Sequence, residues 1–205
     1  MEVGMSLEKK NYIVHPLRFA MWLFLLTVIM IFGSLTSAYL VNKSFLAQPM
    51  IYDLPAVLFT NLLVILFSSV PMQYAVWAGK RGEHTKALLA LGMTLVLGVW
   101  FILGQFQAWE ELTASGLPLV DSARTDAINP GRVDNTVSFF YIFTGLHVLH
   151  LVAAIIAVVV TWIKTVAKKY TKEGMAIGYE LTATFWHFLG ALWLYLYLFL
   201  KYTQS

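Results

Sequence analysis

Residues 135–163 read NTVSFFYIFTGLHVLHLVAAIIAVVVTWI, which is 29 consecutive positions without Asp, Glu, Lys or Arg. A bilayer core is about 30 Å thick, and about 20 apolar residues in an α-helix are enough to cross it. Hydrocarbon offers the backbone no hydrogen-bond partners, so a single segment of this kind has to be a helix. The stretch therefore predicts a transmembrane helix, and it sets the class in which the rest of the chain is interpreted.

Four more segments of the same kind divide the chain. The windows hold 23 to 29 residues each, and of the 25 acidic and basic residues all but Glu180 lie outside them. We therefore predict an all-α integral membrane protein, a single membrane domain over residues 1–205 built as a bundle of five transmembrane helices. The helices are predicted at about 19–42, 54–79, 87–109, 135–163 and 174–200.

The overall composition supports the same class. Apolar residues make up 59% of the 205 positions and charged residues 12%, against about 25% charged residues in soluble domains. The chain has no cysteine, which excludes a disulfide framework, a thiolate metal site and a cysteine nucleophile.

Basic residues are unevenly divided between the two sides of the predicted bundle. The N-terminal tail and the second and fourth connections hold ten of the fourteen Lys and Arg residues. By the positive-inside rule we expect a cytoplasmic N-terminus and a periplasmic C-terminus. The net charge of +3 then reflects membrane sidedness, and we predict no nucleic-acid partner.

Histidines and one carboxylate are the most informative polar groups inside the windows. His147 and His150 lie three residues apart on the fourth predicted helix, and Glu180 and His187 lie seven apart on the fifth. Antiparallel packing of these helices could bring the three imidazoles to one level, and imidazole and carboxylate groups are ligands for iron, copper or zinc. A stand-alone membrane metalloenzyme using these four residues is therefore one hypothesis.

The number and spacing of these groups favour a structural role instead. Two histidines three apart on one helix cannot serve as axial ligands to two stacked haems, and a di-iron bundle needs several embedded carboxylates, whereas here Glu180 is the only one. Polar groups in lipid are commonly used for hydrogen bonds between helices, and Asn61 and Ser68, seven apart on the second helix, fit that use.

Two longer motifs resemble a known family. The run FFYIFTGLHVLH at 139–150 resembles the helix signature of subunit III of haem–copper respiratory oxidases, with two aromatics, then Thr-Gly, then two histidines three apart. The run FWHFLGALWLYLY at 185–197, preceded by Glu180, is similar to the final helix of that family. The match covers essentially all five predicted helices and resembles the short five-helix bacterial form.

The chain departs from the family pattern at two places. Where the family usually has a Ser-Glu pair in its first helix, this chain has Thr27 and Val28, and where it often has Asp after the Trp-His-Phe cluster, this chain has Gly190. No role of the helix 1 carboxylate is therefore expected here.

The resemblance implies an accessory subunit of a proton-translocating cytochrome c or quinol oxidase. Such a subunit has no catalytic residue, metal or cofactor of its own, and haem and copper are expected in the partner subunits. It contacts oxidase subunit I directly, joins subunit II and the other respiratory subunits, retains phospholipid and sustains turnover in the bacterial inner membrane. The residues expected in structural, lipid or interface roles are Asn61, Ser68, His147, His150, Glu180, Trp186 and His187.

Besides the metalloenzyme, two other hypotheses stay open. One is that the chain is a relative of subunit III that is associated with a nitric-oxide reductase. The electron donor, cytochrome c or quinol, also stays open, because donor-binding sites belong to other subunits. A small transporter is disfavoured because the number of helices is odd and the two halves of the chain show no similarity.

Overall fold

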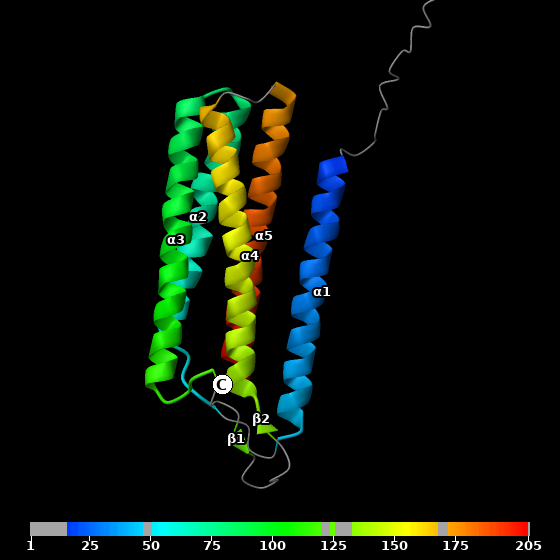
Figure 1. Ribbon diagram of the computed structural model, residues 1–205, viewed down its shortest axis with the longest axis vertical. Coiled ribbons are helices and arrows are strands. Elements are labelled where there is room, and N and C mark those ends of the chain that lie inside the picture. The colour runs from blue at the N-terminus through cyan, green and yellow to red at the C-terminus, as the bar shows by residue number, and fades with distance from the viewer. Residues whose placement is uncertain (1–15, 47–50, 120–123, 126–132, 168–171, 205) are drawn as a thin grey trace, which may run out of the picture.

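The computed structural model describes residues 16–46, 51–119, 124–125, 133–167 and 172–204. These residues form five long helices, each of which, with α5 counted from Ile177, is long and apolar enough to cross a membrane. The predicted number and type of elements are therefore confirmed (Figure 1). The helices are α1 (Pro16–Ser44), α2 (Val57–Lys80), α3 (His84–Ala114), α4 (Thr136–Val166) and α5 (Lys172–Gln204).

Two very short strands accompany the helices. β1 (Arg124–Thr125) pairs antiparallel with β2 (Val133–Asp134), so the connection between α3 and α4 contains a little sheet structure that the all-α prediction lacked. The pair holds only two residues per strand, a length that the alternation of side chains along a strand cannot reveal in a sequence.

The observed helix ends differ from the predicted windows. α3 runs from His84 to Ala114, beyond the predicted 87–109, and α2 begins three residues later than predicted, at Val57. The windows are bounded by charged residues, such as Lys86 and Glu110 around the third, but a helix continues past the hydrocarbon into the interface, where charged side chains meet water. α1, α4 and α5 likewise extend beyond their windows at one or both ends.

One end of the bundle collects most of the described basic side chains, and we call it the basic end. α2 and α3 are joined there by a tight turn in which Gly82 has φ +76°, a conformation that side chains with a Cβ rarely adopt. Several basic residues used to predict the orientation, namely Lys9, Lys10, Arg132, Lys168 and Lys169, lie outside the described residues. The described residues that define the basic end are Arg18, Lys80, Arg81, Lys86 and Lys164.

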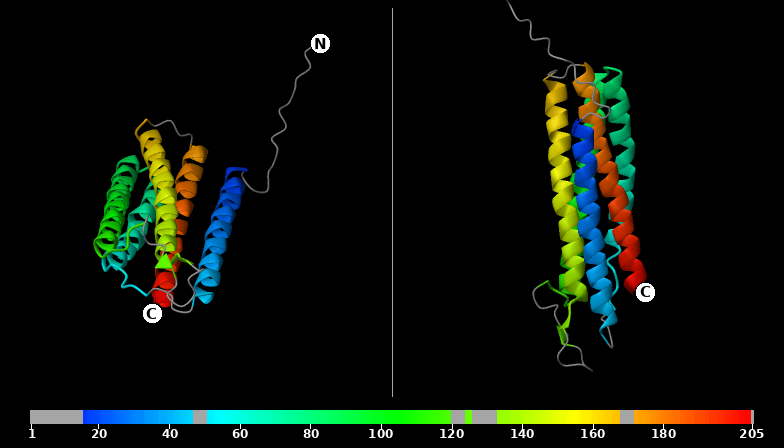
Figure 2. Two further views of the ribbon diagram at one scale, coloured as in Figure 1. Left: turned by 60° about the horizontal axis from the view of Figure 1, so that its bottom comes forward. Right: turned by 90° about the vertical axis from the view of Figure 1, so that its right-hand side faces the viewer.

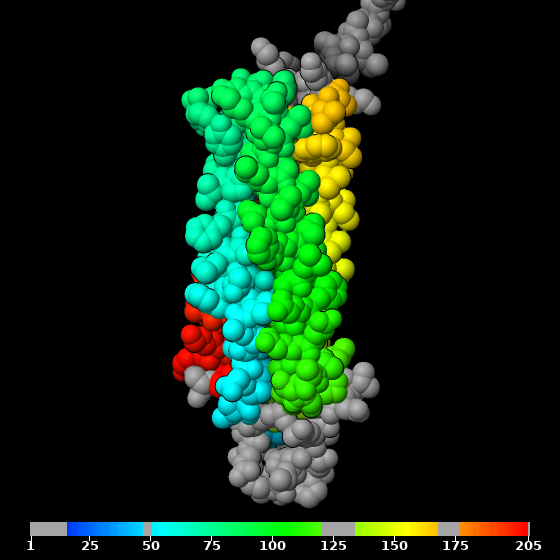
Figure 3. Space-filling view, turned by 90° about the vertical axis from the view of Figure 1, so that its left-hand side faces the viewer, coloured from blue at the N-terminus to red at the C-terminus, as the bar shows by residue number. Residues whose placement is uncertain are grey.

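Four helices form a closed group and the fifth lies beside it. α2 and α3 pack side by side and make up most of one face (Figure 3), and α4 and α5 complete the group. α1 lies against α4 and α5, on the side away from α3 (Figure 2). Half of the membrane-spanning window of α5 is buried, but only 22% of that of α1. α5 is therefore the central helix, and α1 is the one most exposed to its surroundings.

Candidate functional site

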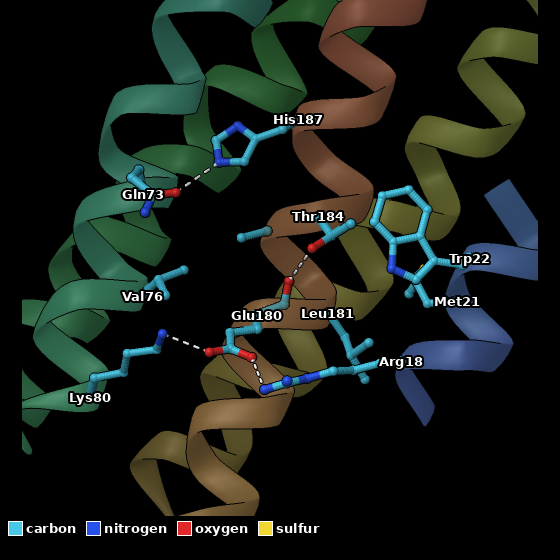
Figure 4. A pocket seen from close by; sticks show the side chains of 11 residues that line it. Arg18, Met21, Trp22, Gln73, Val76, Lys80, Glu180, Leu181, Thr184 and His187 are labelled. Carbon is cyan, nitrogen blue, oxygen red and sulfur yellow. Dashed lines mark hydrogen bonds and ion pairs between the residues drawn. The ribbon is translucent and has the colours of Figure 1, made fainter. Parts of the chain in front are cut away.

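A groove opens near the basic end between α1, α2 and α5 (Figure 4). It encloses about 320 Å³, and each of the three helices contributes both polar and apolar side chains to it. Charged groups and apolar walls meet in it. Its lining residues are Arg18, Met21, Trp22, Gln73, Val76, Lys80, Glu180, Leu181, Ala183, Thr184 and His187.

Glu180 is held between two basic side chains at the end of this groove. Arg18 Nη2 of α1 donates to Glu180 Oε2 at 2.5 Å, and Lys80 Nζ of α2 lies 2.6 Å from Glu180 Oε1 (Figure 4). Both carboxylate oxygens are thereby engaged, by helices on opposite sides of α5. This pairing matters because an unpaired carboxylate is costly inside a membrane-spanning helix.

The two partners of Glu180 were missed by the sequence reasoning. Arg18 and Lys80 lie just outside the predicted windows and were assigned to the tail and to a connection. Long basic side chains at helix ends extend along the helix, so a residue outside the span can reach a group inside it. The available signal was that Lys80, Arg18 and Glu180 all lie within a few residues of the same predicted end of the bundle.

His187 and Gln73 form the upper part of the groove. His187 Nε2 donates to Gln73 Oε1 at 3.2 Å, which joins α5 to α2 (Figure 4). On the other wall, Trp22 of α1 is 65% exposed, so a large aromatic side chain borders the opening. The groove therefore has a charged end, and beyond that end polar and apolar side chains line it together.

His147 lies in the middle of the bundle, away from the groove. It is fully buried, and its ring centroid is 4.8 Å from that of Trp193 and 5.7 Å from that of Phe101. Neither ring nitrogen has a hydrogen-bond partner among the described residues. His147 thus contacts α3 and α5.

His150 faces a different helix. Its Nδ1 donates to the carbonyl of Leu146 at 2.7 Å, and its ring lies 5.8 Å from Phe32 and 6.5 Å from Phe24, both on α1. The three histidines therefore meet three different neighbours, and the described residues contain no group of three or more His, Cys, Asp or Glu side chains placed to hold a metal ion. Antiparallel packing of α4 and α5 therefore does not bring the three imidazoles together at one point.

Asn61, Ser68 and Trp186 are buried and connect helices. Trp186 Nε1 of α5 donates to Ser68 Oγ of α2 at 2.8 Å, and Ser68 donates to the carbonyl of Ile65 at 2.6 Å. Asn61 packs its amide against Gly104 of α3, where a Cβ would overlap the amide oxygen. These residues hold α2 against its two neighbours.

The two departures from the family pattern also lie at helix contacts. Val28 is 1% exposed and belongs to the apolar core. A Cβ at Gly190 would lie 3.8 Å from Ser69 Oγ and 3.9 Å from the Ile65 carbonyl, so the glycine lies close to α2. Neither position carries a charged group here.

Gln105 of α3 is a further buried polar residue that the sequence reasoning did not single out. It is 0% exposed, and neither atom of its amide group has a partner among the described residues. The signal was available, since Gln105 is an amide inside a 23-residue window otherwise dominated by apolar residues.

Comparisons with known proteins agree with one another. The model of the family described as cytochrome c oxidase subunit III matches residues 1–205. A probable cytochrome c oxidase subunit 3 of Rickettsia bellii is 28% identical over 206 residues, covering 90% of this chain and 68% of the relative. The corresponding protein of Rickettsia prowazekii is 30% identical over 173 residues, covering 82% and 56%.

A more distant bacterial relative has the same name. The cytochrome c oxidase subunit 3 of Corynebacterium diphtheriae is 26% identical over 142 residues, which covers 69% of this chain and 63% of the relative. The chain thus spans between about half and two thirds of the length of these relatives.

Proposed function

The chain belongs to the cytochrome c oxidase subunit III family, and from this premise we propose that it is the accessory subunit III of a proton-translocating haem–copper terminal oxidase of aerobic respiration. In this role it carries no redox centre, catalytic residue or metal of its own. Haem and copper belong to the partner subunits, and the chain contacts subunit I directly and joins subunit II in the same complex. Its place is the bacterial inner membrane.

The arrangement of the embedded polar groups supports an accessory role. His147, His150 and His187 each turn to a different helix and serve contacts within the bundle. The competing hypothesis, a membrane metalloenzyme, would need these side chains and Glu180 to converge on one point. A metal analysis of the purified chain discriminates the two, because the metalloenzyme predicts stoichiometric metal that is lost in His147→Ala.

The observation that carries the proposal is the groove with its charged end. Arg18 and Lys80 are each about half exposed, and together they present two positive charges to the single carboxylate of Glu180. One positive charge is left over at the end of a groove that also has apolar side chains along its walls. We infer that the groove retains a phospholipid, with its phosphate at Arg18 and Lys80 and an acyl chain along Met21, Trp22 and Ala183.

Lipid analysis of the purified oxidase complex tests this role. Arg18→Gln should weaken the binding of one phospholipid roughly five-fold and so reduce the amount that co-purifies, because a basic side chain near a headgroup contributes about 1 kcal/mol. Arg81→Gln is the matched control, because Arg81 also lies at the basic end but stacks on Trp77 at 3.5 Å, outside the groove. Equal lipid content in the two variants would contradict lipid retention at this groove.

Sustained turnover provides the functional measurement. In His187→Leu the link between α2 and α5 is lost, and we expect oxidase activity to decline progressively during turnover while the haem spectrum of the complex stays unchanged. A shifted haem spectrum would mean that the chain takes part in the redox centre, which the accessory role excludes.

We also propose that the basic end faces the cytoplasm and that the C-terminus is periplasmic. Basic residues concentrate on the cytoplasmic side of membrane proteins, and the chain contains no cysteine that would interfere with labelling. A thiol reagent that does not cross membranes should label Arg81→Cys from the cytoplasm and Lys201→Cys from the periplasm. The reverse pattern would invert the orientation.

A further inference from the structure

Four buried polar side chains lie near one another in the middle of the bundle, one on each of α2, α3, α4 and α5. Each is at most 1% exposed. Each has at least one polar atom without a hydrogen-bond partner among the described residues: Nδ2 of Asn61, both amide atoms of Gln105, both ring nitrogens of His147 and Nε1 of Trp193. Together they account for most of the buried, unpartnered polar atoms in the described part of the chain.

Packing and ring contacts bring the four helix segments that carry these side chains together. Asn61 packs against Gly104, the residue next to Gln105. Phe101, one helical turn before Gln105, has its ring centroid 5.7 Å from His147 and 4.9 Å from Trp193. The rings of His147 and Trp193 are in turn 4.8 Å apart. The cluster thus surrounds the segment of α3 between Phe101 and Gln105.

Other buried polar groups of the same helices are satisfied. Thr94 donates to the Ala90 carbonyl at 3.0 Å, Trp186 donates to Ser68, and Thr161 lies 2.9 Å from Thr182. The remaining buried, unpartnered atoms in the described residues lie at the ends of helices or in connections. They belong to Tyr52, His84 and Thr136, whereas Glu83 Oε2 forms an ion pair with Lys86 Nζ at 2.8 Å.

We propose that Asn61, Gln105, His147 and Trp193 form a binding site for a small cluster of ordered water molecules that joins α2, α3, α4 and α5 at mid-depth. The site offers both donors and acceptors: the amide and indole N–H groups donate, the Gln105 oxygen accepts, and a neutral His147 does one of each. Water matches this set because it donates and accepts at once, and buried waters typically make about three hydrogen bonds to such groups.

The chemistry of the cluster favours water over other small ligands. None of the four side chains is a carboxylate, a lysine or an arginine, so an ion would find no opposite charge among them. Dry helix contacts in a membrane rely on close packing, for which leucine would serve at these positions. Amide, imidazole and indole groups gathered at one depth are instead the kind of surroundings in which internal waters are kept.

The two tryptophans of α5 provide an internal comparison. Trp186 and Trp193 are buried to the same extent, but the Trp186 indole donates to Ser68 whereas that of Trp193 has no described partner. The full chain, labelled with ¹⁵N at the indoles and reconstituted in lipid vesicles, is measured by magnetisation transfer from water. Trp193→Phe and Trp186→Phe assign the two signals.

We expect transfer from water to the Trp193 indole to be several-fold faster than to the Trp186 indole. Gln105→Leu removes an amide from the site and should slow the Trp193 transfer toward the Trp186 value. Thr94→Val, a control at an equally buried position of α3 whose hydroxyl bonds within its own helix, should leave it unchanged. Equal transfer at both indoles in the unmodified chain would overturn the proposal.

Discussion

The approach of α2 to α3 at Gly104 gives a prediction with a worked magnitude. In Gly104→Ala the new Cβ would overlap Asn61 Oδ1 and lie 3.0 Å from Asn61 Cγ and 3.1 Å from Nδ2. Asn61 is 1% exposed, so its amide cannot withdraw into solvent. Adding a methyl group to a packed core typically costs about 1–3 kcal/mol of unfolding free energy.

Gly92 of the same helix supplies the matched control. A Cβ at Gly92 would meet nothing within 4 Å, so Gly92→Ala has no steric cost. Replacing glycine by alanine inside a helix gains up to about 1 kcal/mol at either position. Because this gain is common to both variants, the difference between them isolates the overlap with Asn61, and we expect it to be about 1–3 kcal/mol.

The measurement is the unfolding free energy of the purified chain in mixed micelles, obtained by titration with a denaturing detergent. Gly92→Ala should be as stable as the unmodified chain or more so, and Gly104→Ala less stable. When Gly104→Ala is introduced into the Asn61→Ala variant, it should lose most of its destabilising effect, because the amide that clashes with the new Cβ is gone. If Gly104→Ala and Gly92→Ala proved equally stable, the close contact between α2 and α3 would be refuted.

Three further substitutions test other contacts. Ser68→Ala removes the acceptor of the Trp186 indole and should cost about 0.6–1.7 kcal/mol in the same titration, whereas Ser34→Ala, whose exposed hydroxyl bonds within its own helix, should cost less. Glu180→Gln weakens two partly exposed ion pairs and should cost about 0.4–2 kcal/mol, with the exposed Glu111→Gln as the near-neutral control. Burial raises the pKa of Tyr52 above its usual value of 10.0, so the unfolded chain loses this proton first and stability should fall as the pH rises above 10.0. Tyr52→Phe should make that fall shallower, and an unchanged slope would contradict the burial.

The number and approximate position of the helices could be read from the sequence because hydrocarbon imposes a simple requirement on it. A span must be apolar over about 20 residues, and in this chain all charged residues but Glu180 lie outside the windows. The exact ends could not be read in the same way. At the interface a helix tolerates charged residues, so the end of the apolar run is not the end of the helix, as α3 shows by continuing through Glu110 and Glu111 to Ala114.

The separation of the three histidines could not be predicted, for a different reason. In a soluble bundle the buried face of a helix is its apolar face, but a helix facing lipid is apolar on every side. His147 and His150 lie on the same helix, and nothing in the surrounding residues indicates that one turns to α5 and the other to α1. The spacing of the two histidines predicts how far apart they lie along α4, but it does not predict which neighbouring helix each of them faces.

Aromatic rings attach the middle of α1 to the other helices. Phe24 packs edge-on against Phe185 with ring centroids 5.4 Å apart, and Phe32 lies 5.8 Å from the ring of His150. Further along, Tyr39 contacts rings of both α4 and α5. These contacts are apolar or nearly so. Lipid chains could cover the same side chains about as favourably, because the hydrophobic effect contributes little to helix association inside a membrane.

Polar bonds at the two ends of α1 provide the specificity that ring contacts alone do not. Near the basic end Arg18 pairs with Glu180 of α5, and at the opposite end Lys43 donates to the carbonyl of Thr203, also of α5. Bonds at both ends of α1 to the corresponding ends of α5 fix the parallel register of the two helices and the rotation of α1 about its axis. The helix can then stand with most of its surface exposed and still keep one position. The other carboxylate oxygen of Glu180 binds Lys80 of α2. The charged end of the groove therefore lies where α1, α2 and α5 converge.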